Sequence, residues 1–437
     1  MLDIQLIREN TEFVKNNLKK RGNHENLRIL EKLIKHDRKW RQFLTELNGK
    51  RHQRKQITSK IAELRKDNKK ATIEISKARA IEAEITILSK QFKKEEEVRR
   101  HYHRQIPNLL HDSVPIGTDE NENVTVKTWG KTAEFNFSIK DHIDLASKLH
   151  IVDLERASKV AGARFFYLVN EGVLLDIALM QFALEEMINK GFKPLEPPFL
   201  MKREPYEGVV SLDNFEKDLY KVQDEDLYLI ATSEHPIAAM HMNEVLLVQD
   251  LPVKIAGVSS NFRREAGAHG KDTRGIFRTH QFNKVEQFIF CHPEDSWTLH
   301  EELIRNSEEL LQKLSIPYRV VNVCTGDIGS FAAKRYDIEA WMPAQNAYRE
   351  IVSCSNCTDY QARRLNIKYR MKEGAPPEGF LHTLNSTALA TGRTIVAILE
   401  NYQQEDGTVI VPRVLRKFMG GIEKIKSEDG KGFNSKL

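Results

Sequence analysis

The sequence predicts an α+β fold that joins an N-terminal antiparallel coiled-coil arm to a core of strands and helices. Three observations support this prediction. Residues 27–106 contain no proline and repeat apolar residues at heptad spacing. Residues 253–288 predict two strands around a glycine-punctuated loop, and residues 334–370 alternate apolar and polar side chains as strands do. A chain of 437 residues is long enough for two or three domains.

The composition is that of a soluble protein. Of all residues, 40% are hydrophobic and 30% are charged, and no apolar run approaches the ~20 residues that span a membrane. The opening residues MLDIQLIREN include Asp3 and Glu9 and lack the continuous apolar core of a secretory signal. We therefore expect no membrane association and a cytoplasmic location.

The cysteines argue against a disulfide framework, because the chain has only four. Cys354 and Cys357 form a single C-x-x-C, which can be half of a zinc site or a redox pair. A zinc site needs two more ligands that the sequence does not mark, so reduced structural thiols are the better expectation.

The N-terminal part is predicted to be helical throughout. Residues 1–26 predict one short helix that stops near Gly22. Its apolar side comprises Ile4, Ile7, Phe13, Val14 and Leu18. Residues 27–106 predict two long antiparallel helices about a polar turn at residues 66–72. The heptad positions are Leu30, Leu33, Trp40, Leu44, Leu47 and Ile61, then Ile81, Ile85, Leu88, Phe92 and Tyr102.

The predicted arm is basic. Each helix of about 38 residues would be ~55 Å long, more than a core needs, so the arm should project into solvent. Residues 28–105 carry 23 Lys and Arg against 11 Asp and Glu, whereas the whole chain has a net charge of only +5. This bias favours a nucleic-acid phosphate backbone as partner. A solvated spacer or a dimer zipper remains an alternative on these features alone.

The predicted hairpin at residues 253–288 concentrates charge. Its basic residues are Arg263, Arg264, Lys271, Arg274, Arg278 and Lys284. Side chains two apart on a strand share a face, so Arg263 should pair with Glu265 and Lys284 with Glu286. Guanidiniums bind phosphate and carboxylates accept from ammonium, so this surface can hold a nucleotide and an amino acid together. The alternative is an exposed hairpin laced by ion pairs worth ~0–1 kcal/mol each.

Two further segments stand out. A helix over residues 173–189 ends before Gly191 and leads into GFKPLEPPFL, a strand whose Pro197 and Pro198 place it at a sheet edge or an interface. Residues 232–234, Thr-Ser-Glu, fall between a strand and a helix, where a helix cap is the simplest interpretation.

Together these segments resemble the seryl-tRNA synthetases among the class II aminoacyl-tRNA synthetases. The stretch NFRREAGAHGKDTRGIFRTHQFNKVEQF resembles motif 2, KPLEPPFL resembles motif 1 with Pro198 in its proline position, and LNSTALATGR resembles motif 3. The resemblance implies an antiparallel β-sheet core flanked by helices. It also implies a tRNA-binding domain at residues 1–110, a linker at 111–135 and a catalytic domain at 136–437.

The resemblance implies that serine reacts with ATP to give seryl-adenylate and pyrophosphate, and that serine then passes to the 3′ end of tRNA(Ser), with tRNA(Sec) an open second substrate. The implied catalytic residues are Arg263, Glu265 and Arg393. The implied ATP-binding residues are Arg263, Arg264, Glu265, Arg278, Thr279, Phe282, Glu350, Ile351, Val352, Ser353 and Arg393. The implied serine-binding residues are Thr232, Ser233, Glu234, Arg263, Glu286 and Thr387.

The resemblance further implies Mg²⁺ on Glu350 and Ser353, tRNA held by the basic arm, and a homodimer through the region around Pro198. Other nucleotide motifs fail, since GAHGKD is not a P-loop and no G-x-G-x-x-G follows a strand. Two other function classes remain as alternatives. One is a catalytically inactive synthetase-like protein that binds nucleic acid, and the other is a ligase that charges a carrier protein with an amino acid.

Overall fold

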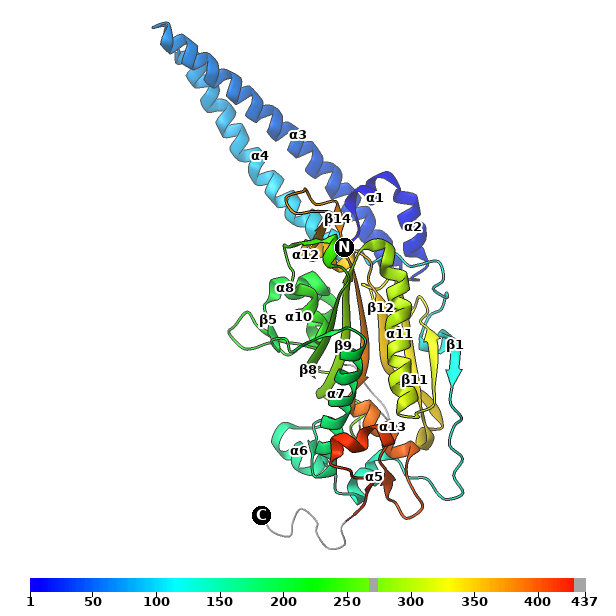
Figure 1. Ribbon diagram of the computed structural model, residues 1–437. Coiled ribbons are helices and arrows are strands. Elements are labelled where there is room, and N and C mark those ends of the chain that lie inside the picture. The colour runs from blue at the N-terminus through cyan, green and yellow to red at the C-terminus, as the bar shows by residue number, and fades with distance from the viewer. Residues whose placement is uncertain (267–273, 428–437) are drawn as a thin grey trace. The chain divides into compact units, whose positions relative to one another are not determined.

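The computed structural model describes residues 1–266 and 274–427, so Lys271 of the predicted loop lies outside the described residues. The chain divides into two compact units, Met1–Leu109 and Leu110–Leu437 (Figure 1).

The first unit is helical, as the sequence predicts. Its helices are α1 (Ile4–Glu9), α2 (Thr11–Lys19), α3 (His24–Lys66) and α4 (Thr72–Gln105). The prediction of one helix over residues 1–26 is wrong, because Asn10 leaves the helical conformation with φ −127° and ψ 48° and separates α1 from α2. Phe13 is consequently 56% exposed, whereas Ile7, Val14 and Leu18 are buried.

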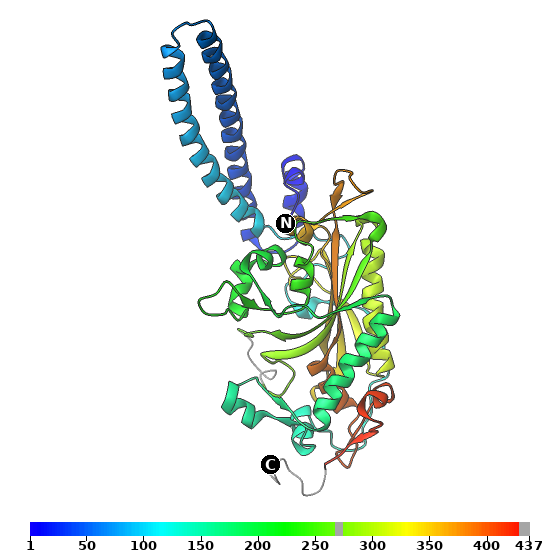
Figure 2. The same ribbon diagram turned by 60° about the vertical axis from the view of Figure 1, so that its left-hand side comes forward.

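The arm is a pair of antiparallel helices joined at one end by a tight turn (Figure 2). Buried heptad residues hold its base, among them Leu30 and Leu33, and Leu47 is buried further along α3. Asp37 of α3 accepts from Arg8 of α1 at 2.7 Å and lies 3.4 Å from Arg99 of α4, so one carboxylate joins three helices. Further along α3, residues 51–60 are almost all exposed, which leaves the middle of the arm with a polar seam.

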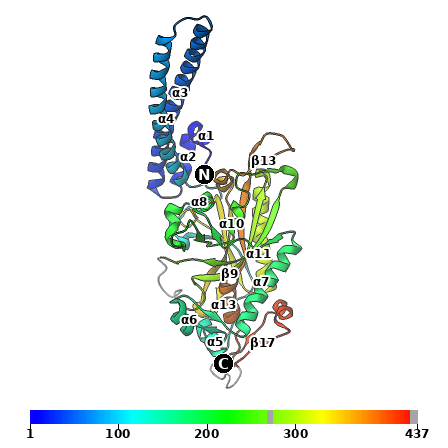
Figure 3. The same ribbon diagram turned by 90° about the vertical axis from the view of Figure 1, so that its left-hand side faces the viewer.

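In the described part of the second unit, eight strands form one sheet in the order β1-β10-β11-β12-β15-β9-β8-β4. Its strands are β1 (Val124–Trp129), β4 (Lys193–Leu195), β8 (Val253–Phe262), β9 (Gln281–Cys291), β10 (Tyr318–Asn322), β11 (Lys334–Met342), β12 (Ala347–Asn356) and β15 (His382–Ala390). Every neighbouring pair is antiparallel except β4 and β8. The predicted hairpin is β8 and β9. Figure 3 shows β9 of this sheet with α7 (Glu171–Asn189) packed against it.

Smaller two- and three-stranded sheets surround this sheet. They pair β2 (Val152–Asp153) with β3 (Tyr167–Leu168), β5 (Leu200–Met201) with β6 (Tyr228–Leu229), β13 (Lys368–Arg370) with β14 (Gly379–Phe380) and β7 (Val245–Leu247), and β16 (Val409–Ile410) with β17 (Lys424–Ile425). The helices of this unit are α5 (His142–Lys148), α6 (Leu154–Ala161), α7 (Glu171–Asn189), α8 (Arg203–Val209), α9 (Leu212–Phe215), α10 (Glu234–Ala239), α11 (Ser296–Lys313), α12 (Tyr360–Leu365) and α13 (Thr391–Asn401).

The two edges of the large sheet are formed by segments that precede its central strands in the chain. Residues 111–135 are not simply a linker, because Val124–Trp129 form β1 at one edge of the sheet and pair with β10. The GFKPLEPPFL segment supplies β4 at the opposite edge, as its prolines predict. Pro197 and Pro198 follow β4 instead of lying within it.

The sheet separates two hydrophobic cores. Alternate residues of β9 point to opposite faces, so Val285 and Ile289 join the core formed with α7, α11 and α13, whereas Phe288 and Phe290 join the core formed with α8, α10 and α12. Lys284 and Glu286 share the face of Phe288 and Phe290. The functional side chains of this strand are therefore on the face covered by α8, α10 and α12.

Candidate active site

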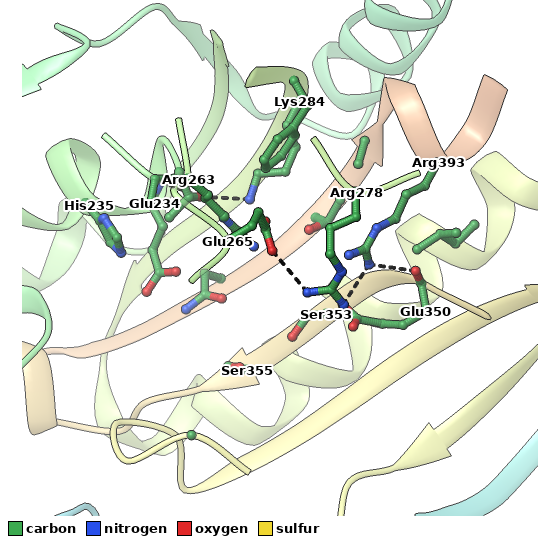
Figure 4. Close-up of a pocket in the computed structure, with 18 of the residues that line it drawn as sticks. Glu234, His235, Arg263, Glu265, Arg278, Lys284, Glu350, Ser353, Ser355 and Arg393 are labelled. Carbon is green, nitrogen blue, oxygen red and sulfur yellow. Dashed lines mark hydrogen bonds and ion pairs between the residues drawn. The ribbon is translucent and has the colours of Figure 1, made fainter. Parts of the chain in front are cut away.

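A cavity of about 510 Å³ opens over the central strands of the large sheet. Its walls come from β9, β12, β15, the start of α13, residues 231–235, and residues on both sides of the loop after β8. Figure 4 shows Glu234 and His235 toward one end of this cavity and Arg278, Glu350 and Arg393 toward the other, with Arg263 between them. We call these the carboxylate end and the arginine end.

Most of the predicted site residues line this cavity. They are Thr232, Glu234, Arg263, Glu265, Arg278, Thr279, Phe282, Glu350, Ile351, Ser353, Thr387 and Arg393. The side chains of Arg264, Ser233, Glu286 and Val352 are not part of its wall. Arg264 is exposed, Val352 packs in the core on the other face of the sheet, and Glu286 is buried against Lys284.

The carboxylate end is a buried cluster of charges. Lys284 Nζ donates to Thr232 Oγ1 at 2.7 Å and forms an ion pair with Glu286, as the strand alternation predicts. Burial, reinforced by the charge of Glu286, raises the pKa of Glu234 to about 7, although hydrogen bonding from Gln361 opposes the rise. Burial also raises the pKa of Glu286, against the influence of Lys284. This end of the cavity therefore places the carboxyl groups of Glu234 and Glu286 and the ammonium group of Lys284 in one buried cluster.

The segment that carries Glu234 is held by Tyr206. Ser233 occupies the N-cap position of α10 but makes no side-chain capping bond. Instead the hydroxyl of Tyr206 accepts from the backbone N–H of Ala231 at 3.3 Å and lies 2.8 Å from His235 Nδ1. This hydroxyl therefore fixes the segment on both sides of Thr232 and Glu234.

Guanidiniums dominate the arginine end. Arg393 donates to the backbone oxygen of Glu350 at 2.7 Å, and its guanidinium stacks on Phe277 at 5.0 Å. Arg278 pairs with Glu265 at 3.0 Å. The predicted strand pairing of Arg263 with Glu265 is wrong, because β8 ends at Phe262 and Glu265 adopts a φ of +49°.

Arg263 lies between the two ends. Its Nε donates to the backbone oxygen of Ala231 at 3.2 Å, and its guanidinium lies 5.1 Å from the centre of the Phe282 ring. Gly392, at the start of α13, approaches the chain near Ile276 so closely that a Cβ there would lie 3.1 Å from the Ile276 carbonyl oxygen.

Several wall residues have no counterpart among the predicted ones. They are His235, Phe277, Lys284, Arg335, Ser355 and Asn385. Strand alternation predicts that Lys284 pairs with Glu286 but assigns Lys284 no site role. Arg335 could have been found from the same alternation, since it pairs with Asp337 two residues along β11. The others carry no local sequence signal.

Glu350 and Ser353 meet the chemical requirements of a magnesium site. Both lie on β12 and line the cavity, and the Glu350 side chain is 45% exposed. Although the side chain is partly exposed, desolvation by the surrounding protein acts to raise the pKa of Glu350, but the guanidiniums of Arg393 and Arg335 outweigh this effect and lower that pKa. The carboxyl group is therefore ionised. Two hard oxygen donors that leave most of a coordination sphere to phosphate and water suit Mg²⁺.

The four cysteines are free and buried. Burial raises the pKa of Cys291 and of Cys354, so both are thiols. Within residues 1–266 and 274–427, no group of three or more His, Cys, Asp or Glu side chains converges as a metal cluster would. In the same residues, no helix combines the length and apolarity needed to cross a membrane.

Comparison with known proteins identifies the family. Residues 1–110 match the seryl-tRNA synthetase N-terminal domain, and residues 219–402 match the tRNA synthetase class II core domain shared by the G, H, P, S and T enzymes. The serine–tRNA ligase of Methanospirillum hungatei is 50% identical over 430 residues, which cover 97% of this chain and 100% of that protein. The chain belongs to the seryl-tRNA synthetase family.

Solved seryl-tRNA synthetases share its fold. The crystal structure of the Pyrococcus horikoshii enzyme complexed with ATP superposes with a TM-score of 0.92 at 50% identity, covering 98% of this chain and all of that one. A cytoplasmic serine–tRNA ligase from Naegleria fowleri, in complex with AMP, has a TM-score of 0.88 at 36% identity and covers 98% of this chain and 99% of its own. The class II fold with its helical arm is thereby confirmed.

Proposed function

We propose that this protein activates L-serine with ATP and transfers the serine to the 3′-terminal adenosine of tRNA(Ser). One observation above all supports this beyond family membership. A single cavity joins a buried carboxylate end, suited to an ammonium group, to an arginine end suited to a triphosphate, and Arg263 lies between them. An inactive paralogue is not favoured, because every predicted catalytic side chain is present in the cavity wall. A carrier-protein ligase is not favoured, because residues 1–110 match the seryl-tRNA synthetase N-terminal domain.

At the carboxylate end, Glu234 is proposed as the counter-charge for the serine ammonium group. Thr232 and Thr387 also line the cavity, and each supplies a hydroxyl group on a small side chain. Glu286 lies beneath them, 2% exposed. A buried carboxylate that accepts from the serine hydroxyl would reject alanine, because the smaller substrate would leave the acceptor unpaired.

At the arginine end, Arg278 and Arg393 are proposed to neutralise the outer phosphates of ATP. Phe282 is proposed to stack on the adenine ring, with Glu265 and the backbone near Thr279 at its edge. The ion pairs that Arg278 makes with Glu265 and Arg393 with Glu350 hold the guanidiniums in place before substrate arrives. Such preorganised positive charge stabilises developing charge without reorganisation.

We propose that the chain needs no nucleophile of its own. An oxygen of the serine carboxylate attacks the α-phosphorus, the bond to the β-phosphate oxygen breaks, and pyrophosphate leaves with that electron pair. Arg263 is proposed to hold the serine carboxylate and the α-phosphate against each other, which lowers their repulsion and aligns the reacting atoms. Glu350 and Ser353 would hold Mg²⁺, which supplies neutralisation of phosphate charge when bound.

The arm is the proposed tRNA-binding element. It carries 23 of the chain's 67 basic residues in residues 28–105, and its middle section is solvated instead of packed. Solvated Lys and Arg side chains on a helix pair can follow a phosphate backbone without base readout.

A homodimer is proposed through the region around Pro198, which is exposed, together with an apolar face of α7. Val173, Leu174 and Ile177 on α7 are 38%, 41% and 41% exposed, and Leu200 of β5 is 39% exposed. Val173 and Ile177 are one helical turn apart and Leu174 is three residues from Ile177, so the three side chains share one apolar face of α7. The four free thiols further support the cytoplasm as the place of action.

The test is amino-acid-dependent exchange of pyrophosphate into ATP, run with each of the common amino acids in the presence of Mg²⁺ and the absence of tRNA. Exchange with serine alone supports both the reaction and the substrate. Exchange with another amino acid would overturn the serine assignment. No exchange at all from folded protein would favour the catalytically inactive alternative.

A further inference from the structure

We propose that Gln361 on α12, oriented by Thr383 on β15, positions the Glu234 carboxylate to receive the ammonium group of the amino-acid substrate. The inference rests on the proposed function and deepens it. It assigns a positioning residue from a segment that contributes nothing to the cavity wall.

The three side chains form one row of hydrogen bonds. Thr383 Oγ1 donates to Gln361 Oε1 at 2.7 Å, and Gln361 Nε2 donates to Glu234 Oε1 at 2.9 Å. Gln361 and Thr383 are both 0% exposed, so water does not compete for these bonds. A flipped amide would set its oxygen against the carboxylate, so the row permits one orientation of the Gln361 side chain.

The row begins in rigid backbone. The N–H of Thr383 donates to the carbonyl of Thr358 at 3.0 Å, and the N–H of Cys357 donates to the carbonyl of Thr383 at 3.0 Å. Thr383 is therefore fixed between β15 and the segment before α12. Gln361 engages Oε1 of Glu234 from α12, which does not line the cavity, and Oε2 is the oxygen proposed to receive the substrate ammonium group.

The charge balance at Glu234 explains why this donor matters. The titratable and charged groups around it are Lys284 and Glu286 of β9, Arg263 after β8, Cys357 before α12, Tyr206 of α8 and the adjacent His235. Burial and then Glu286 raise the pKa of Glu234 to about 7, whereas the bond from Gln361 lowers it, together with Lys284 and Arg263. Gln361 is thus the uncharged group that favours the ionised form.

Ionisation of Glu234 has a direct consequence for binding, because an ammonium group binds the carboxylate and not the protonated acid. Serine affinity should therefore fall as the pH drops through the pKa of Glu234. Removing the Gln361 donor should raise that pKa further. The loss of affinity would then begin at a higher pH.

The test compares Gln361→Met, which keeps side-chain length but removes the donor, with the unaltered enzyme. Serine Kd by calorimetry and serine KM in pyrophosphate exchange are measured from about pH 6 to about pH 9. We expect the midpoint of the pH dependence to move upward, with serine affinity near pH 6 reduced about tenfold for each unit of the move. Affinity near pH 9 and the KM for ATP should change little.

Thr383 provides a second route to the same result. Thr383→Val removes the hydroxyl that orients the amide and should shift the midpoint in the same direction by less, and Thr383→Ser should restore it. The matched control is Gln403→Met. Gln403 is 2% exposed and donates to the Lys140 carbonyl at 3.0 Å, remote from Glu234, so its loss should leave the midpoint unchanged.

A rise in serine KM that is equal at all pH values, or an equal shift in Gln403→Met, would overturn the proposal. If Gln361→Met does not fold, the pair Thr383→Val and Thr383→Ser decides by itself. Failure of the proposed function has a different signature, since it appears as the wrong amino acid or no exchange in the unaltered enzyme. The row can then still be tested by binding, because it acts on the ammonium group that all α-amino acids share.

Discussion

Arg263 lies between the two ends of the cavity and is proposed to contact both reactants. It lies 5.1 Å from the Phe282 ring centre and is held by the carbonyl of Ala231, so its guanidinium has a fixed position before substrate binds. A group that contacts both reactants contributes to alignment as well as to charge neutralisation. Its loss should therefore affect the chemical step more than ground-state binding.

Arg263→Ala is expected to lower serine-dependent pyrophosphate exchange by at least about 10²–10³-fold, the scale of losing one preorganised donor. Binding of tRNA, measured by filter retention, should stay close to normal because the arm is untouched. Arg305→Ala, which removes an exposed guanidinium on α11, is the control and should leave exchange unchanged. Loss of tRNA binding in Arg263→Ala would show that the cavity, not the arm, is the main tRNA contact.

Glu234 is expected to show a conflict between stability and function. Its pKa in the folded state, about 7, lies above the ordinary value of 4.5, so folding disfavours its ionised form. The stability contribution of this group is retained at low pH and declines as the pH rises from about 4.5 toward 7. Glu234→Gln should therefore stabilise the free protein above about pH 7, on the order of 1.4 kcal/mol per unit of pKa difference.

Urea unfolding at about pH 5 and about pH 8 measures this effect, and the gain should be larger at the higher pH. The same variant should lose a hundredfold or more in serine-dependent exchange, since removing a buried counter-charge costs about 3–5 kcal/mol. If Glu234→Gln and the unaltered protein were equally stable at about pH 8, the ionised Glu234 carboxylate would not destabilise the folded protein.

At the residue scale, strand periodicity predicts which side chains pair only where the strand continues through both residues. Lys284 and Glu286 pair because β9 is straight through both positions. Arg263 and Glu265 do not, because the chain leaves β8 after Phe262. Gln361 could not be predicted, since its partners Glu234 and Thr383 are brought to it only by the fold.

At the scale of elements, a sustained heptad pattern predicts the long helices of the arm but not the short elements of the chain. The helices α3 and α4 are predictable with their turn, because 43 and 34 residues of sustained helical sequence outweigh any local ambiguity. The break between α1 and α2 is not, because one asparagine interrupts an otherwise continuous apolar pattern. Strand β1 also escapes prediction, because it is a short segment stabilised by pairing with β10, far along the chain.

Shortening the arm should impair the transfer of serine to tRNA while leaving serine activation intact. Replacing residues 45–88 with a short glycine-containing turn keeps the base contacts of Asp37 and the Trp40–Phe92 pair. Pyrophosphate exchange should remain close to normal, whereas tRNA charging should fall strongly and tRNA binding should lose much of its salt dependence.

A companion variant keeps the arm at full length but replaces two exposed basic residues, Arg51→Glu and Lys55→Glu, which separates the effect of charge from that of length. This variant should also weaken tRNA binding if charge, and not merely arm length, is responsible. Unchanged charging by the shortened enzyme would remove the case for the arm as the tRNA contact.

For the whole molecule, the sequence predicts which segments form strands but not how distant strands pair. The order β12-β15-β9-β8 brings together residues more than a hundred positions apart, and this order assembles the cavity. Turn and edge signals such as Pro198 limit where a strand can lie. They do not specify its neighbour, which depends on packing of both cores at once.

The proposed assembly is testable through the exposed face of α7. Ile177→Asp places a charge at the centre of the apolar face formed with Val173 and Leu174. If this face forms the dimer, burial of an unpaired carboxylate should shift the protein to monomers in sedimentation experiments at micromolar concentration. Val160→Asp, at a 74% exposed position on α6, should leave the association state unchanged. A dimer that persists in Ile177→Asp would place the interface elsewhere.

The burial of all four native cysteines makes the folded protein a clean background for thiol-specific dyes. A cysteine introduced as Lys66→Cys at the tip of the arm, together with Val160→Cys on the second unit, would offer two reactive sulfurs to a fluorophore pair. Energy transfer between the two dyes would then report the position of the arm relative to the catalytic unit, and its change as tRNA binds.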